Sequence, residues 1–276
     1  SALDTNTTGA SNTAVGKNAL TANTTGNCNV AVGIGALDLN TTGTDNVAVG
    51  RDAGGCQTTA SNNVAIGAAT LFKNTGANNT AVGYLASMCN TTGADNAAFG
   101  RQALYSNTTA AQNVAIGTCA LYTTTTGANN TSVGNYSSKL NTTGLNNVSV
   151  GYAALCSNTT GQQNVAVGKS AGDVTTTGSN NIMIGKGSDA DAVGTNNVIA
   201  MGENVVSILN AFTFGAGGND SRIAFGATSI TAPSDQRLKE DIKNDTAGLS
   251  FINDLRPVTY KWRQEKDIPE EMRTHV

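Results

Sequence analysis

Proline, aromatic residues and charge are all scarce in this chain of 276 residues. It has 3 Pro and 1 Trp, and aromatic residues make up 5% and charged residues 13% of it. Because one buried aromatic side chain removes roughly 150–250 Å² from water, this scarcity excludes an ordinary core of large side chains. The chain also has 32 Gly and is 39% hydrophobic, which excludes a typical disordered tail. The composition therefore favours an architecture in which small side chains stack in register.

The net charge and the lack of long hydrophobic runs exclude further classes of partner. A formal charge of −3 gives no basic footprint for nucleic acid or an anionic membrane. No run reaches the roughly 18 apolar residues of a membrane span, and the first residues carry no signal-peptide pattern. We expect neither a nucleic-acid partner nor membrane insertion. The chain starts at Ser1 without Met, so we interpret it as a fragment or a processed product of a longer protein.

Charged residues are concentrated at the C-terminus. Residues 1–233 contain 18 charged residues, whereas the much shorter stretch 234–276 contains 17. A jump of this size indicates a boundary between two kinds of structure. We predict a repeat shaft over residues 1–202, a β-rich connector or collar over 203–233, and a separate C-terminal segment over 234–276.

A repeat of 17 residues dominates the shaft. Its N-x-A-x-G motif ends in twelve glycines from Gly16 to Gly202, and the spacing is 17 except for a 16 between Gly67 and Gly83. A second motif, T-T-G, follows halfway through most units, and Ala60 and Ala110 substitute for its glycine in two others. So strict a period predicts a solenoid. Its representative structural residues are Asn29, Gly33, Asn46, Gly50, Asn113, Gly117, Asn147 and Gly151.

Each unit has the pattern of a short strand between turns. Val30, Ala31 and Val32 alternate in size, which is typical of a strand, and a Leu follows where the coil turns. We expect the T-T-G glycine to supply a positive φ in the second turn. Two turns in 17 residues predict a coil of a parallel β-roll with two short strands, which pairs with the next coil at about 4.8 Å.

The core of such a roll is built only by stacking. We expect the two larger strand residues and the Leu of each coil to form inner columns of Val, Ile and Leu, and the Asn residues to form a ladder of amide hydrogen bonds. A single thin roll of small residues buries little surface. We therefore expect several chains side by side, with three as the expected number.

These motifs resemble those of known fibres. The N-x-A-[VI]-G unit resembles the head repeat of trimeric autotransporter adhesins, over roughly residues 5–202, although the adhesin repeat is usually shorter than 17 residues. The longer form T-T-G-x-x-N-x-A-V-G-x-x-A-L is similar to repeats of phage tail fibres and of bacterial surface fibres. The resemblance implies an all-β, homotrimeric β-solenoid fibre, with its handedness left open.

The C-terminal segment resembles a second family. The sequence S-D-Q-R-L-K from Ser234 to Lys239, followed by L-R-P-V-T-Y-K-W, resembles the intramolecular chaperone auto-processing domain of endosialidase-type tail spikes. The resemblance implies that Ser234 attacks the peptide bond between Pro233 and Ser234, and that Lys239 supports the proton transfers. The local pattern predicts a helix from Ser234, a second helix over 249–255 and a strand over 258–262, making a short α+β segment. The alternative is that Ser234 only caps a helix and Lys239 is a solvated charge.

Other motifs carry little weight. Gly168, Lys169 and Ser170 imitate the end of a phosphate-binding loop, but position 163, where its first glycine belongs, is Gln163. The five cysteines have no metal or disulfide spacing, so we expect free, partly buried thiols, and we predict no metal and no cofactor. Threonine ladders that order water are a further alternative. No cluster of exposed aromatics suited to sugar stacking is expected in the shaft.

The leading hypothesis is a structural and host-attachment fibre of a virion tail or a bacterial surface. Its expected partners are two further copies of the chain and a host-cell receptor, either a glycan or a protein. Two alternatives remain open: a purely structural spacer, and a chain whose assayable function is a single-turnover autoprotease that cleaves before Ser234.

Overall fold

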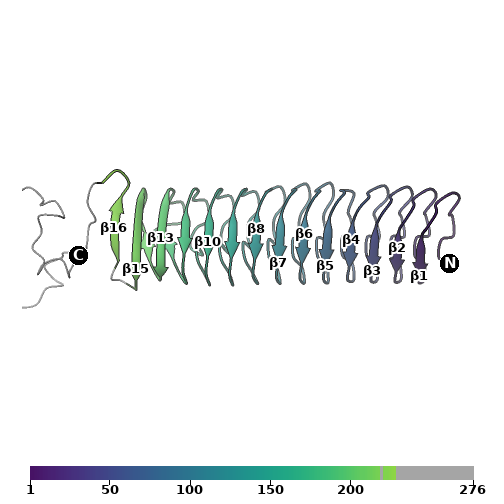
Figure 1. Ribbon diagram of the computed structural model, residues 1–276, viewed down its shortest axis with the longest axis horizontal. Coiled ribbons are helices and arrows are strands. Elements are labelled where there is room, and N and C mark those ends of the chain that lie inside the picture. The colour runs from purple at the N-terminus through teal and green to yellow at the C-terminus, as the bar shows by residue number, and fades with distance from the viewer. Residues whose placement is uncertain (218–219, 228–276) are drawn as a thin grey trace, which may run out of the picture. The chain divides into compact units, whose positions relative to one another are not determined.

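The computed structural model describes residues 1–217 and 220–227, which form a parallel β-solenoid of about twelve coils without a helix. Figure 1 shows the strands side by side in chain order, from β1 in purple to β16 in green. The predicted all-β solenoid is therefore confirmed. The coils carry the strands β1 Thr13–Val15, β2 Val30–Val32, β3 Val47–Val49, β4 Val64–Ile66, β5 Thr80–Val82, β6 Ala97–Phe99, β7 Val114–Ile116, β8 Thr131–Val133, β9 Val148–Val150, β10 Val165–Val167 and β11 Ile182–Ile184. The remaining strands are β12 Asp189–Ala190, β13 Val198–Glu203, β14 Val206–Ser207, β15 Ala211–Ala216 and β16 Ser221–Ala224.

One long sheet joins the coils. It contains fourteen strands in the order β1 to β11, then β13, β15 and β16. Neighbouring strands from β1 to β15 pair in parallel, and Val30 pairs with Val47, one repeat later. The 17-residue period is therefore the step from one coil to the next.

The interior is narrower than the sequence pattern suggests. Ala31 is fully buried, whereas Val49 and Ile116 are 37% and 41% exposed. The predicted inner columns of Val and Ile are therefore wrong, because these side chains lie on the outer face of the sheet. Leu37 is buried together with Ala31 in one cluster, as are the leucines of most other coils. With asparagines inside the coils and a leucine inside most of them, the strand usually contributes only the methyl group of an Ala to the interior.

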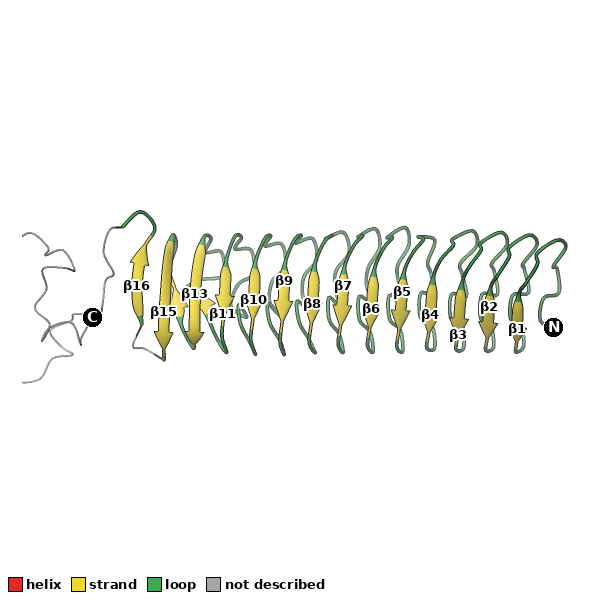
Figure 2. Cartoon of the chain, in the orientation of Figure 1, coloured by secondary structure: helices red, strands yellow, loops and turns green. Residues whose placement is uncertain are grey.

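Each coil also has one strand where we predicted two. On the second arm, Leu37 N donates to Ala53 O at 2.9 Å, so the coils remain bonded there. However, Gly35 and Leu37 have φ of 68° and 49°, in the left-handed region. Alternating left-handed residues cannot form an extended strand. The arm is consequently a series of turns, shown in green in Figure 2.

Two columns of asparagine run through the solenoid. In the inner Asn column, which includes Asn29 and Asn46, the Asn46 backbone N–H donates to Asn29 Oδ1 at 3.0 Å. The second column, the turn Asn column, consists of the residues that begin the Asn-Thr-Thr-Gly turns, such as Asn23 and Asn40, and was not predicted to form a ladder. Here Asn40 Nδ2 donates to Asn23 Oδ1 at 3.0 Å and to Gly43 O at 3.1 Å. Most buried amide groups are thereby paired in both corners of the coil, although the acceptors Asn40 Oδ1, Asn107 Oδ1 and Asn158 Oδ1 in the turn Asn column have no partner.

The two glycine positions serve different purposes. Gly50, at the end of a strand, has φ of 137°, and a Cβ there would lie 2.6 Å from Gly67 O. The T-T-G glycines do not have the positive φ that we predicted. At Gly43 a Cβ would instead collide with Ala60 O of the next coil, so close approach of the backbones is what favours glycine there.

The single 16-residue unit loses its residue in the T-T-G turn. Asn74, Thr75 and Gly76 replace the usual four residues, and Gly76 N donates to Asn74 Oδ1 at 3.2 Å. The strands on either side remain in register, with Val64 paired to Thr80. The turn therefore absorbs the deletion without disturbing the sheet.

The parallel ladder continues beyond Gly202 into the predicted connector. Gly202 pairs with Gly215, so the step falls to thirteen residues, and β16 then adds antiparallel to β15. Arg222 Nε donates to Thr213 Oγ1 at 3.2 Å across this pair.

The chain divides into two units, Ser1–Pro233 and Ser234–Val276. The helices and the strand predicted between 234 and 262 lie outside the described residues.

Candidate functional site

The outer face of the sheet forms a continuous apolar surface. It consists of the first and third residues of strands β1 to β11, which we call the strand-face stripe. No residue of the stripe is charged, and most are Val or Ile. Eleven strands spaced at about 4.8 Å make the stripe roughly 50 Å long. Its most exposed members are Val15, Val49, Ile66, Phe99, Ile116, Val150, Val167, Ile182 and Ile184.

Tyrosines gather on the second arm of the coils. Tyr105 and Tyr122 are one repeat apart and stack with their ring centroids 5.1 Å apart. Tyr136 and Tyr152 meet edge to face at 5.9 Å. We expected no cluster of exposed aromatics suited to sugar stacking; the structure shows two tyrosine pairs in which Tyr152 is exposed and the other three rings are half-buried. These residues are far apart in the sequence, and only the 17-residue step brings them together.

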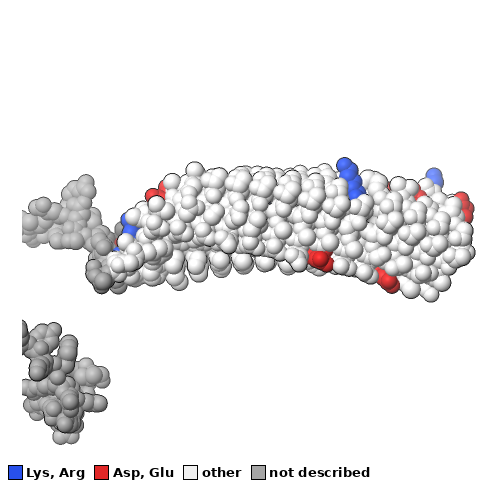
Figure 3. All heavy atoms as spheres, turned by 90° about the horizontal axis from the view of Figure 1, so that it is seen from above, with Lys and Arg blue, Asp and Glu red and all other residues white. Residues whose placement is uncertain are grey.

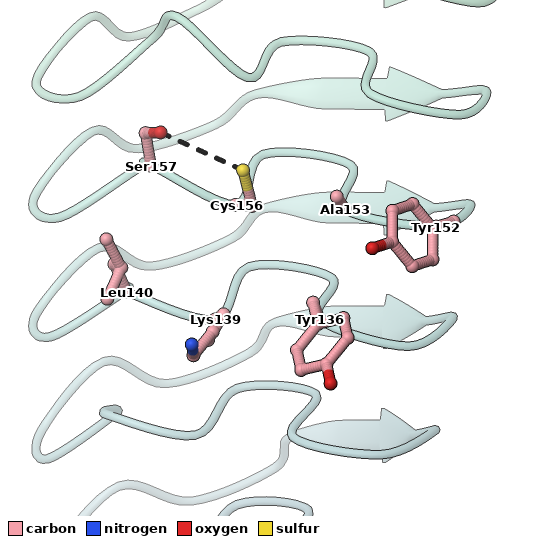
Figure 4. A pocket seen from close by; sticks show the side chains of 7 residues that line it. All are labelled: Tyr136, Lys139, Leu140, Tyr152, Ala153, Cys156 and Ser157. Carbon is pink, nitrogen blue, oxygen red and sulfur yellow. Dashed lines mark hydrogen bonds between the residues drawn. The ribbon is translucent and has the colours of Figure 1, made fainter.

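A cleft of about 330 Å³ lies between two neighbouring coils at the second tyrosine pair. We call it the Tyr cleft. Figure 4 shows its side chains on the two coils, with Tyr136 and Lys139 on one and Tyr152 on the next. The volume is within the range of small-molecule sites, about 300–1,000 Å³. The lining residues are Tyr136, Lys139, Leu140, Tyr152, Ala153, Cys156 and Ser157.

The backbone around the Tyr cleft is tied to the coils on both sides. Tyr136 N donates to Thr118 O at 2.9 Å, and Leu140 N donates to Cys156 O at 3.1 Å. Beneath the cleft, Ser138 replaces the usual core Leu, and its Oγ donates to Ser149 Oγ at 2.9 Å. The cleft is therefore built on a fixed frame.

The charge around the Tyr cleft is of one sign. The segment 96–172 contains three cations, Arg101, Lys139 and Lys169, and no Asp or Glu. Lys139 Nζ lies 5.4 Å from the ring centroid of Tyr136. Within residues 1–217 and 220–227, Lys139 makes no ion pair. Figure 3 shows how sparsely charged side chains are distributed over one face of the shaft.

An unusual carboxyl group lies near the end of the shaft. Asp189 is buried, and desolvation raises its pKa to about 7. The backbone N–H groups of Val174 and Ala190 donate to its two oxygens at 2.9 Å and partly offset this effect, whereas Asp173 raises the pKa further. Asp189 is thus the one strongly perturbed acid among the residues that the structure describes.

The cysteines are all free. Cys119 is buried and Cys28 is exposed, whereas the other three are half-buried. The expected free thiols are therefore confirmed, but Cys28 is not partly buried as we predicted. In the described part of the chain no group of three or more His, Cys, Asp or Glu residues could hold a metal ion, and no helix could cross a membrane.

The segment 168–170, which resembles the end of a phosphate-binding loop in sequence, lies in an ordinary coil. Gly168 has φ of 139°, like the other strand-end glycines, and Lys169 is exposed immediately after it. The segment 168–170 therefore has the backbone of the repeat.

The predicted catalytic residues Ser234 and Lys239, and the scissile bond after Pro233, lie outside the described residues. Comparison with known proteins covers this part of the chain. No curated protein and no solved structure shows significant similarity to the chain. Residues 234–276 match the model of the family described as "Chaperone of endosialidase", so the chain is a β-solenoid followed by a segment of that chaperone family.

Proposed function

We propose that this chain is a structural and host-attachment fibre protein, such as a phage tail fibre or a related trimeric surface adhesin. Three copies form the fibre, and a C-terminal chaperone segment assists their assembly. The proposed location is a virion tail or the outside of a cell. The repeats form the shaft, and one or more surfaces on it bind a host receptor.

The strand-face stripe is the observation that supports this proposal best. A stripe about 50 Å long and about 10 Å wide exposes on the order of 500 Å² of apolar surface, which is at the upper end for a monomer. Because each coil repeats the same residues, identical chains can pack along the whole stripe in register. The chaperone match at residues 234–276 supports assembly independently.

Sedimentation equilibrium of the purified chain tests the trimer. We expect a trimer, and we expect the double variant Ile116→Asp and Val150→Asp to dissociate, because each charge would be buried between chains without a partner. Thr126→Asp, on the exposed T-T-G turn, is the matched control and should remain trimeric. A monomeric unmodified chain would contradict the proposal.

Attachment is tested separately by pull-down of candidate host cells with the labelled trimer. Retention on cells supports the attachment function. If the labelled trimer binds none of the candidate host cells, the attachment function is contradicted and the purely structural spacer is supported.

Self-cleavage before Ser234 is the second candidate function, favoured by the chaperone match. Ser234 Oγ would attack the carbonyl carbon of Pro233, the C–N bond would break to free the Ser234 amine, and water would hydrolyse the resulting ester. A neutral Lys239 amine would accept the hydroxyl proton. Mass spectrometry of the complete gene product and of its Ser234→Ala variant tests this. We expect a shortened shaft only when Ser234 is present, and identical intact masses would reject self-cleavage.

A further inference from the structure

We propose that the Tyr cleft binds an acidic saccharide, that is, a sugar ring carrying a carboxylate. The inference rests on the proposed attachment function, because it names the surface and the ligand chemistry through which the shaft meets its receptor. It concerns the second arm of the coils and is separate from the strand-face stripe.

The shape of the cleft fits a sugar ring. Tyr136 and Tyr152 stand at 86° to each other, so their rings form a corner. Tyr152 is 53% exposed, which leaves ring surface free for the C–H face of a pyranose. A volume of about 330 Å³ accommodates one or two such rings.

The charge of the cleft selects among sugars. Lys139 is the only charged residue lining it, and the surrounding segment 96–172 has no carboxylate to neutralise it. A ligand carboxylate would therefore gain an ion pair without displacing an existing one. The Tyr136 and Tyr152 hydroxyls and Ser157 Oγ supply hydrogen-bond partners for sugar hydroxyls.

The cleft also lies at a coil that departs from the pattern of the repeat. The coil of residues 130–146 has serine at three buried positions, Ser132, Ser137 and Ser138, where most coils have two Ala and a Leu. The buried serines and the two tyrosines of the Tyr cleft therefore lie in the same pair of adjacent coils. In a shaft of near-identical units, this coincidence makes a local site rather than a continuous surface.

Isothermal titration calorimetry of the trimer with small acidic oligosaccharides tests the inference. The probes are a hexuronate trisaccharide, a nonulosonic acid trisaccharide and the neutral counterpart of the first. We expect at least one acidic probe to bind at least ten-fold more tightly than the neutral one, and this preference to shrink as salt is raised. The absence of binding by both acidic probes at 5 mM, or equal binding of the neutral probe, would overturn the inference.

Matched variants locate the binding. Tyr152→Ala should weaken binding about ten-fold or more, and Lys139→Gln should remove most of the preference for the acidic probe. Tyr84 lies at the same repeat position as Tyr152 and is equally exposed, at 52%, but it does not line the cleft. Tyr84→Ala should therefore bind like the unmodified chain, and an equal loss in both tyrosine variants would overturn the inference.

Cell adhesion separates this inference from the proposed function. If cells bind the unmodified trimer and the Tyr152→Ala variant equally well, the attachment function holds but the cleft is not its site. If the cleft binds the acidic probe but no cells are retained, the saccharide site holds and host attachment fails. Binding of acidic peptides in preference to acidic saccharides would overturn the assignment of ligand class.

Discussion

At the scale of single residues, the amide ladders show how tightly one position depends on the next coil. The turn Asn column is interrupted where Gln57, Thr124 and Thr175 replace Asn. Buried acceptors lack a partner at these places, among them Asn107 Oδ1 and Asn158 Oδ1, each one coil before a Thr. Because an unpaired buried polar atom costs about 1–3 kcal/mol, each interruption weakens the stack locally.

Thr124→Asn should therefore stabilise the chain. The new amide can donate to Asn107 Oδ1 and accept from Asn141 Nδ2, and Asn has nearly the volume of Thr. We expect the free energy of unfolding to rise by about 1–2 kcal/mol, measured by urea denaturation followed by circular dichroism. Thr126→Asn, on the exposed turn, should change it by less than about 0.5 kcal/mol. A destabilised Thr124→Asn variant would refute the ladder explanation.

Asp189 predicts a dependence of stability on pH. Its pKa is about 7 in the folded chain and near 3.9 when unfolded, so the folded state holds the proton more tightly. The free energy of unfolding should then fall as pH rises from about 4 to 7, by on the order of 1 kcal/mol per pH unit at most, and level off above. Asp189→Asn should flatten this slope, whereas Asp45→Asn, at an exposed position, should not. Denaturation curves at four pH values within this window provide the measurement.

At the scale of elements, the coil tolerates change in its turns but not in its strands. The 16-residue unit already shows a T-T-G turn shortened by one residue with the flanking strands in register. A one-residue shift inside a strand would instead exchange the buried Ala for a Val from the outer face.

Deletion of Thr42 should consequently be tolerated, because it leaves the Asn-Thr-Gly turn that occurs naturally at residues 74–76. We expect a cooperative unfolding transition shifted by no more than about 2 kcal/mol. Deletion of Ala48, in the middle of β3, should abolish that transition or produce insoluble protein. Similar behaviour of the two deletions would contradict the proposed division of roles within the coil.

The sequence predicts the elements well and their orientation poorly. The period, the strand that ends in the N-x-A-x-G glycine and the parallel stacking follow from spacing, because the coils repeat the same turn signals, whereas the second strand predicted for each coil is absent from the coils that carry β1 to β10. Alternation of Val and Ala does not say which side is the interior, since both are apolar. That choice depends on how much space Leu37 and the asparagines leave inside a coil. The sequence does not reveal the Tyr cleft either, because its lining residues belong to two coils that meet only through stacking.

At the scale of the whole molecule, the described solenoid behaves as a one-dimensional array in which each coil is bonded to its neighbours. Deletion of residues 96–112, one complete coil, should therefore give a folded solenoid shorter by about 5 Å with an unchanged oligomeric state. Deletion of residues 96–104 alone removes about half a repeat, so the residues after the deletion would no longer face their equivalents in the preceding coil. We therefore expect this deletion to disrupt folding. Small-angle scattering and sedimentation measure both outcomes, and a folded half-coil variant would contradict the array description.

The direction of the backbone bonds in this array has a mechanical consequence. The N–H groups that link one coil to the next, such as Leu37 N to Ala53 O, point along the axis on which the coils are stacked. A pulling force along that axis is resisted only by the few hydrogen bonds between one coil and the next. The solenoid therefore yields by the detachment of one coil after another. A force perpendicular to the axis is shared by many coils. The solenoid therefore resists bending far more strongly than it resists the detachment of a coil.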